Sequence, residues 1–284
     1  MKNLQEYILK RAQSHTAPNQ RTYSTLTLPD RDVVAAALDL SKKSVEIAAL
    51  EAGIIPQRYL RNIGSLEISG QIKLLKARAL LIGLGGLGGT IGQLLARMGL
   101  GTLILADGDF FNESNLNRQA FSSEQNIGQR KVEAAYAEIL KINAATEVET
   151  FAGFVTENDL PRLVGSVEVA IDALDNMPTR FLLEKACKAG KIPLVHGAVG
   201  GFWGQVTTIY PEDVGLKAFY GESPTIPEKG IEVEVGNLAG IVSAIASLQV
   251  QEVIKIITGL GRPLRNRLLF LDSLNGSAET ISLK

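Results

Sequence analysis

Apolar and polar positions follow each other in blocks that predict alternating strands and helices. Two apolar runs without alternation, at about 78–83 and 102–106, have the pattern of parallel strands that are covered on both faces. A helix-length segment that ends near Met98 separates them, and this strand–helix–strand order predicts an α/β fold. Further predicted elements are helices at about 131–142 and 238–258, and strands that end at Asp172 or cover 192–196, 203–210, 268–272 and 279–284.

The first 56 residues precede this pattern and are predicted to form a small helical extension. Helices are predicted over 4–13, 33–40 and 44–53, with an irregular segment over 14–30 and with Asp30 and Ser41 as candidate N-caps. The last two helices have the outline of a helix-turn-helix, but the second carries two glutamates and no arginine. We therefore favour a helical hairpin that packs on the main domain, residues 57–284, or on a partner, over a DNA-binding element.

Composition, cysteine content and hydropathy exclude several classes of protein. The chain of 284 residues has a formal net charge of −1 and is 45% hydrophobic, which suits an α/β domain with an appendage and argues against a nucleic-acid binder. The single cysteine, Cys187, excludes an intrachain disulfide and a Cys-rich zinc site, which fits a cytoplasmic location. No signal peptide is expected, and residues 238–258 contain enough polar side chains to predict a core helix rather than a membrane span.

A glycine-rich turn follows the first apolar strand. Gly83, Gly85 and Gly88 form a GxGxxG motif with Gly86 inside it. Glycine lets the backbone approach a ligand closely, and the next helix offers free N–H groups to an anion. Asp107 ends the second strand 24 residues after Gly83, where a carboxylate can accept hydrogen bonds from ribose hydroxyls. The motif alone suits NAD or FAD equally well.

Two cations follow the second strand and change this interpretation. Arg118 lies in the segment SNLNRQ, and Lys131 begins the predicted helix at 131–142. A triphosphate carries about four negative charges and leaves water only when they are paired, whereas a dinucleotide does not need two fixed cations at this place. The pattern therefore favours ATP. The same stretch supplies further candidate ligands: Asp109, Ser114, Asn115 and Gln119.

Acidic side chains also lie at the carboxyl end of the strand that ends at Asp172. Asp172, Asp175 and Asn176 follow one another there, and the carboxyl ends of parallel strands form the ligand edge of such sheets. Asp175 is a candidate ligand for Mg²⁺ on the phosphates. Asp175 or Asn176 could also cap the following helix. Cys187 and His196 are interpreted as packed side chains, and the long loop 211–237 as a lid or partner-facing segment.

Residues 57–284 resemble the ThiF/MoeB/HesA family, relatives of the ubiquitin-activating enzymes. The resemblance rests on the order and spacing of RYLRNI (58–63), GLGGLG (83–88), LADGD (105–109), SNLNRQ (114–119), GQRKVEAA (128–135), DALDN with Arg180, GQVT (204–207) and the block at 236–255. It implies a Rossmann-like ATP-binding domain whose mostly parallel sheet is continued by antiparallel strands. It also implies adenylation of the C-terminal carboxylate of a small ubiquitin-like protein, which usually ends in Gly-Gly, by a symmetric homodimer.

The resemblance also implies roles for individual residues. Arg61 resembles the arginine that reaches into the partner subunit's ATP site. Arg118 and Lys131 resemble the residues on the β- and γ-phosphates, Asp107 resembles the ribose ligand, and Asp175 the Mg²⁺ ligand. Asn115 and Gly86 would line the same site.

Two departures from the family pattern concern cysteine. Many members carry two CxxC pairs for structural zinc, and Lys217 and Tyr220 stand about where the first pair would fall; no structural zinc is expected. Many members also carry a cysteine shortly before the block at 236–255, where this chain has Glu232 or its neighbours. We therefore expect adenylation only, without a thioester or persulfide step on this chain.

Three other functions remain open at this point. An enzyme of the same fold could activate another carboxylate or a tRNA base, although the chain lacks a basic excess. A scaffold could hold nucleotide without turnover. GxGxxG taken alone would favour an NAD-linked oxidoreductase.

Overall fold

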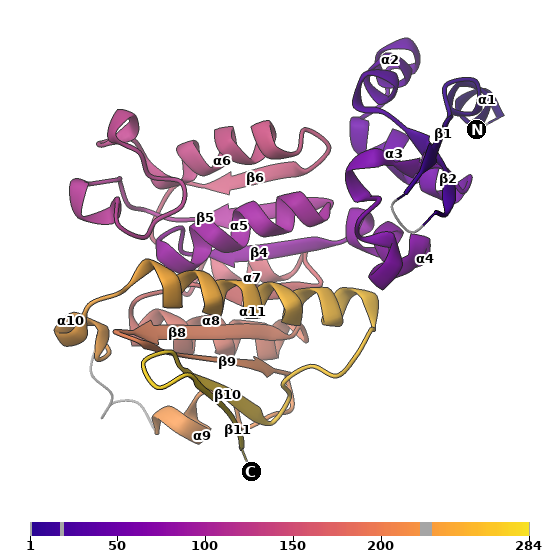
Figure 1. Cartoon of the computed structure of the whole chain (residues 1–284). Helices are drawn as coiled ribbons and strands as arrows, with labels where there is room; N and C mark the ends of the chain where they lie inside the picture. Colours follow the sequence, from indigo (N-terminus) through magenta and orange to yellow (C-terminus); the bar gives the residue numbers. More distant parts are fainter. Residues whose placement is uncertain (1, 18–19, 222–228, 284) are drawn as a thin grey trace.

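An eight-stranded sheet lies at the centre of the computed structural model, which describes residues 2–17, 20–221 and 229–283 (Figure 1). The strand order is β11-β10-β9-β8-β7-β4-β5-β6. The five strands from β8 to β6 in this order are parallel, and β9, β10 and β11 continue the sheet in antiparallel pairing. The predicted fold class is confirmed. The bounds are β4 Arg78–Ile82, β5 Thr102–Ala106, β6 Glu147–Phe151, β7 Val169–Asp172, β8 Leu194–Gly200, β9 Trp203–Ile209, β10 Arg267–Asp272 and β11 Ser277–Ser282.

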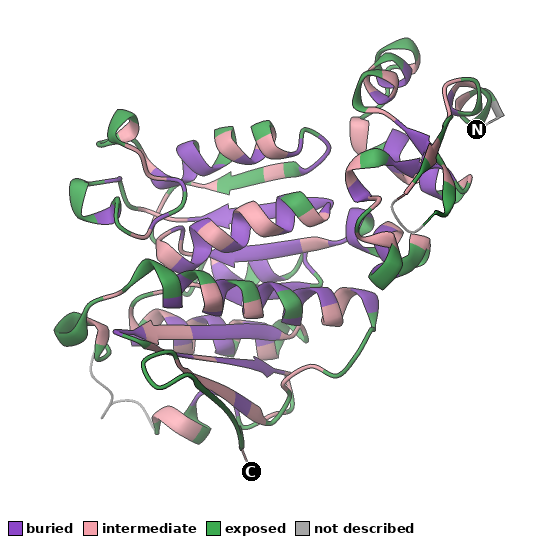
Figure 2. Ribbon diagram, in the orientation of Figure 1, coloured by how far each residue is buried: buried purple, intermediate pink, exposed green. Residues whose placement is uncertain are grey.

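Helices cover both faces of the parallel strands. Helices α5 (Gly86–Met98), α6 (Lys131–Ile142) and α11 (Ala239–Thr258) lie on one face, and α7 (Leu160–Val164) and α8 (Met177–Gly190) on the other (Figure 1). Successive side chains of a strand point to opposite faces, so Leu81 joins the first core while Leu80 and Ile82 join the second. This double burial explains the unbroken apolar runs. Figure 2 shows β4 and β5 mostly buried, whereas the edge strand β11 is exposed.

Helix α11 is the one helix among the described residues that is long and apolar enough to cross a membrane. Its apolar side chains Ile241, Val242 and Ile245 belong to the first core. Its buried polar side chains also have partners, because Glu252 accepts a hydrogen bond from Thr208 and Gln249 donates one to the Asp172 carbonyl. The prediction of a core helix is confirmed.

The ligand edge of the sheet follows from its topology. Strand β4 pairs with β5 on one side and with β7 on the other, so the chain order reverses between β4 and β7. Loops after such a switch point separate and leave a crevice at the carboxyl ends of the strands. The glycine turn follows β4, and Asp172–Asn176 follow or end β7, so both motifs meet at this crevice.

Residues 2–56 form a mixed α/β unit with its own small core. Helices α1 (Lys2–Leu9), α2 (Leu28–Leu38) and α3 (Lys42–Glu51) were predicted approximately. The prediction of an irregular segment over 14–30 is wrong, because β1 (Gln13–Thr16) and β2 (Thr22–Leu26) form a hairpin that β3 (Ile55–Pro56) joins. Ser41 caps α3 as predicted, but Thr27, rather than Asp30, caps α2.

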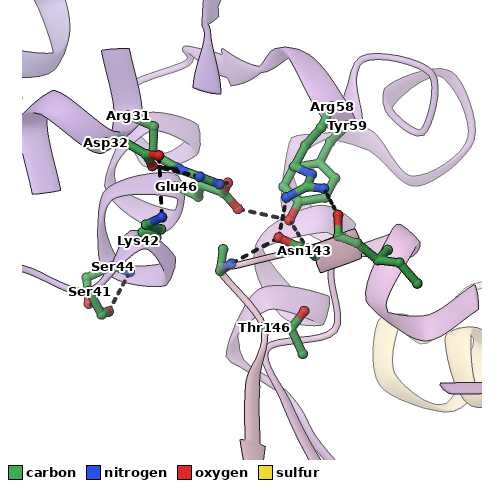
Figure 3. A network of polar contacts seen from close by, with 12 residues as sticks. Arg31, Asp32, Ser41, Lys42, Ser44, Glu46, Arg58, Tyr59, Asn143 and Thr146 are labelled. Carbon is green, nitrogen blue, oxygen red and sulfur yellow. Dashed lines mark hydrogen bonds and ion pairs between the residues drawn. The ribbon is translucent and has the colours of Figure 1, made fainter. Parts of the chain in front are cut away.

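A buried polar network attaches this unit to the main domain (Figure 3). Glu46 pairs with Arg31 at 2.8 Å and accepts a hydrogen bond from the Tyr59 hydroxyl at 2.9 Å. Asn143, at the end of α6, donates to the same hydroxyl at 3.0 Å. Arg58 in turn donates to the side chain of Asn143 and to the backbone next to it. The unit is therefore joined to the amino-end edge of the sheet, opposite the glycine turn.

The remaining helices connect these parts. Helix α4 (Ile63–Lys76) leads into β4 and packs against α3 and α11. The region predicted as a long loop, 211–237, contains the short helices α9 (Lys217–Tyr220) and α10 (Glu232–Val235). Residues 222–228 of that predicted lid lie outside the described residues.

Candidate active site

A cavity of about 490 Å³ lies at the crevice between β4 and β7, within the usual size range of small-molecule sites. It brings together most of the residues predicted from the sequence. Those in its lining are Gly83, Gly85, Gly86, Asp107, Asp109, Arg118, Gln119, Lys131, Asp175 and Asn176.

The glycine turn has a geometry that other residues would disrupt. Gly83 has a φ of +90°, and a Cβ there would lie 2.4 Å from the carbonyl oxygen of Ala173. A Cβ at Gly88 would lie 1.8 Å from the carbonyl oxygen of Gly83. Gly88 does not line the cavity; it lets α5 begin directly against the turn. The first glycine therefore shapes the turn, and the third permits the packing beneath it.

Asp107 braces the turn from the neighbouring strand. Its carboxylate accepts hydrogen bonds from the backbone amides of Leu84, at 2.6 Å, and Asp109, at 2.7 Å. Burial raises the pKa of Asp107 above its ordinary value, although these two amides lower it. Each carboxylate oxygen has a second lone pair, so the predicted contact with ribose stays compatible with this bracing.

Two cations stand beside the turn. Lys131 is buried and lies 3.1 Å from Asp109, whose carboxylate is exposed at 53%. Arg118 donates to the Ser114 carbonyl at 3.0 Å and to the Asn117 side chain at 2.8 Å. Both side chains line the cavity and are held by neutral or exposed partners, so their charges remain available to an anionic ligand.

Asp175 and Asn176 have separate roles at the end of β7. Asn176 caps α8, since its side chain accepts a hydrogen bond from the Thr179 amide. Asp175 lies 2.5 Å from Lys229 and is exposed at 73%. Desolvation raises the pKa of Asp175, but the Lys229 ion pair together with hydrogen bonding from Asn176 and the backbone outweighs it, and the net pKa lies below the ordinary value. One exposed, ionised carboxylate beside a polyphosphate site is the donor set that Mg²⁺ usually takes from a protein, so Asp175 fits this ion.

A buried polar chain runs behind the cavity, and three of its members, Arg180, Gln205 and Tyr220, line it. Asp172 lies 2.7 Å from Nδ1 of His196, whose Nε2 lies 3.2 Å from the Tyr220 hydroxyl. Gln205 donates to the same hydroxyl at 2.7 Å, and Arg180 reaches it at 3.4 Å. Burial lowers the pKa of His196, with a smaller contribution from Arg180 that opposes the effect of Asp172. A neutral His196 can then donate to Asp172 and accept from Tyr220. Its side chain is fully buried, as predicted.

Several polar atoms in the cavity lining make no hydrogen bond within the protein, although Arg180 Nε lies 3.7 Å from the Asp172 carboxylate in an ion pair. Among the described residues, four buried side-chain nitrogen or oxygen atoms make no hydrogen bond, and three of them belong to the lining: Gln119 Oε1, Arg180 Nε and Asn237 Oδ1. Unpaired buried polar atoms are rare and costly in native proteins. Their concentration here indicates a site built for a polar ligand.

The structure does not bring every predicted residue to the cavity. Ser114 and Asn115 lie in a short 3₁₀ turn, where the Asn115 side chain accepts from the Asn112 amide; neither residue lines the cavity. Arg61 is exposed between Tyr59 and α4, at the opposite edge of the sheet, and no hydrogen bond or ion pair of its side chain is found among the described residues. Arg61 therefore does not reach the cavity of its own subunit.

Several lining residues had no predicted role. Arg180 and Gln205 were present in the quoted motifs, and Tyr220 was noted only as a replacement for cysteine. Phe154 follows β6, is exposed at 72% and packs over Gly108. No local pattern pointed to it, because its place depends on the pairing of β5 with β6.

Comparison with known proteins agrees with this geometry. The family model described as the ThiF family matches residues 59–284. The chain belongs to the ThiF family. Residues before 59 lie outside the match, and the membership predicted from the motifs is confirmed.

Curated members of the ThiF family resemble most of the chain. The SAMP-activating enzyme E1 of Haloferax volcanii is 36% identical over 229 residues, which are 79% of this chain and 84% of that protein. The molybdopterin-synthase adenylyltransferase of Escherichia coli is 34% identical over 76% of this chain and 88% of its own. These names agree with the prediction of an enzyme of the adenylyltransferase class.

A solved structure shares the fold. The crystal structure of E. coli MccB with ATP superposes with a TM-score of 0.71 at 20% identity, over 90% of this chain and 79% of that chain. At this identity the likeness concerns the fold alone, and it supports the predicted Rossmann-like architecture.

Proposed function

We propose that this chain uses ATP to adenylate the C-terminal carboxylate of a small ubiquitin-like carrier protein of the sulfur-carrier type. One observation carries the proposal: Lys131, Arg118 and Asp175 surround the glycine turn in a single cavity. Two cations and an ionised carboxylate beside free helix N–H groups suit a metal-bound triphosphate. The names of the relatives and the ATP in the MccB structure support the same substrate class.

The chemistry follows from this arrangement. The carrier carboxylate is ionised at neutral pH, so no base is needed. Its oxygen forms a bond to the α-phosphorus, the bond from that phosphorus to the bridging oxygen breaks, and pyrophosphate leaves with the bonding electrons. Arg118 and Lys131 neutralise the charge that develops on the pyrophosphate. Mg²⁺ held by Asp175 would supply further charge neutralisation. Positioning and electrostatic stabilisation provide the rate enhancement.

A covalent step on this chain is not part of the proposal. Cys187 is buried inside α8 with 2% of its surface exposed, and burial raises the pKa of its thiol. A nucleophilic cysteine needs an accessible thiolate. The adenylate is therefore passed to an acceptor that another protein supplies.

A carrier-dependent exchange assay tests the proposal. Incorporation of labelled pyrophosphate into ATP is measured with a panel of carriers that end in Gly-Gly. Lys131→Met is expected to reduce exchange about 100-fold or more, as for other lost transition-state charges, and Asp175→Ala should abolish it. The control Lys141→Met alters an exposed lysine of the same helix and should leave exchange unchanged. Exchange that survives Asp175→Ala, or binding of NADH but not ATP, would contradict the proposal.

We propose further that Arg61 acts in the site of a second copy of the chain. Its exposed position at the far edge of the sheet supports action in trans. Arg61→Ala and Asp175→Ala chains are expected to be inactive alone and to recover part of the activity when mixed, because one hybrid site is then intact. Heterodimers that form without recovered activity would favour action in cis.

A further inference from the structure

Lys229 has no predicted role, yet it contacts the carboxylate that is expected to hold the metal ion. Its ammonium nitrogen lies 2.5 Å from Oδ2 of Asp175. The two residues are 54 positions apart in sequence, and the segment 229–237 contributes Gly230, Ile231, Glu232 and Asn237 to the cavity lining. No sequence pattern indicates this contact, because it depends on the path of that segment.

Residues 229–237, which we call the crossing segment, touch both sides of the cavity. Gly230 and Ile231 line it, and a Cβ at Gly200 of β8 would lie 3.0 Å from the Ile231 side chain. At its far end the Gly201 amide donates to the Gly236 carbonyl at 2.7 Å, and Asn117 donates to the Asn237 carbonyl at 3.2 Å. The Lys229–Asp175 pair contacts the near end, so the segment touches other parts of the chain at both of its ends.

The Asp175 carboxylate cannot pair with the Lys229 ammonium group and bind Mg²⁺ well at the same time. Mg²⁺ demands near-ideal octahedral geometry from its oxygen ligands, and a positive charge within about 4 Å of it is repelled. Binding of the metal-bound nucleotide at Asp175 therefore opposes the Lys229 contact. Since the two side chains are exposed at 47% and 73%, the ion pair is weak and can be displaced at low cost.

We propose that Lys229 occupies the metal position at Asp175 in the nucleotide-free protein, and that Mg²⁺-bound nucleotide displaces it and releases the near end of the crossing segment. This proposal rests on the function proposed above.

Calorimetry with Mg²⁺-bound β,γ-methylene-ATP tests the competition directly. Lys229→Met should bind this probe about twofold to fivefold more tightly than the unaltered chain, the size expected for loss of an exposed ion pair. The matched control Lys185→Met removes a lysine from another exposed pair, with Glu157, and should not change the affinity. Equal or weaker binding by Lys229→Met would overturn the competition. Absence of binding by the unaltered chain would overturn the proposed function as well.

Fluorescence reports on the segment itself. Trp203, the one tryptophan of the sequence, lines the cavity. Its ring lies 3.4 Å, and Val235 of α10 lies 3.3 Å, from a Cβ built at Gly201. The probe should change the Trp203 emission of the unaltered chain. Without nucleotide, Lys229→Met and Asp175→Asn should already differ from it in the direction of the bound state, and Lys185→Met should not. Identical emission of all four nucleotide-free chains would show that the pair does not hold the segment.

Discussion

The carboxylate of Asp107 accepts a hydrogen bond of 2.6 Å from the backbone amide of Leu84, so the end of β5 clamps the glycine turn that follows β4. The pairing of these two parallel strands brings the residues together although they are 23 positions apart. Asp107, which was predicted as a ligand of the nucleotide, therefore also stabilises the backbone of the glycine turn.

Asp107→Asn tests this clamp. The amide keeps the shape of the side chain but replaces one acceptor oxygen by a donor, which must then face a backbone N–H. We expect binding of Mg²⁺-bound β,γ-methylene-ATP to weaken about tenfold or more, since one unsatisfied group costs about 1–3 kcal/mol. Calorimetry measures the effect. Asp159→Asn, which alters an aspartate that also accepts from a backbone amide but does not line the cavity, serves as the control and should bind normally.

Gly88→Ala should destabilise the fold rather than only weaken the site. The new Cβ would lie 1.8 Å from the carbonyl oxygen of Gly83, and backbone cannot move aside as a side chain can. We expect a loss of about 2 kcal/mol or more in the free energy of unfolding, measured by urea denaturation. Gly240→Ala, in the first turn of α11 with no atom within 4 Å of the new Cβ, should be neutral or slightly stabilising. Similar losses for both would contradict the packing role of Gly88.

Glu46→Gln should destabilise the N-terminal unit, in which the Arg31–Glu46 pair joins α2 to α3. The change leaves the buried guanidinium of Arg31, exposed at 5%, without its 2.8 Å charge partner. Breaking a buried pair costs about 3–5 kcal/mol; the second partner Asp32 should limit the loss to about 3 kcal/mol. Thermal unfolding measures it. Glu51→Gln in the same helix removes an exposed pair with Lys76 and should cost less than about 1 kcal/mol.

His196 should make stability depend on pH below about 6.5. Burial lowers its pKa in the folded protein, so between that pKa and the ordinary value of about 6.5 the unfolded chain binds a proton that the folded chain does not. Stability is therefore full above about pH 6.5 and falls as the pH drops, by up to about 1.4 kcal/mol per pH unit.

Urea unfolding between about pH 5 and 7.5 measures the dependence of stability on pH. This pH window lies above the ordinary titration range of carboxylates. His196→Gln should remove most of the dependence in that window. The sequence contains one other histidine, His15 in β1, and His15→Gln should retain it. An unchanged slope in His196→Gln would place the proton uptake elsewhere.

The central sheet and the glycine-turn part of the candidate site were predictable from local sequence. Strands buried on both faces show as unbroken apolar runs, and the strand–glycine turn–helix order around Gly83 marks an anion site, since both signals arise from neighbours in the chain. The position of Arg118 and Lys131 after the second strand added two candidate cations, which the structure brings to the cavity. The hairpin of β1 and β2 escaped prediction because its short strands are mostly exposed and polar.

The sequence by itself determined the fold class of this protein, its family and the residue types around the glycine turn. Tertiary structure alone decided which residues share the cavity. It placed Tyr220 against His196, set Lys229 on Asp175, and left Arg61 at the opposite edge of the sheet. The physical reason is that these contacts join elements far apart in the chain, through strand pairing and the path of the crossing segment, and no local periodicity encodes such distances.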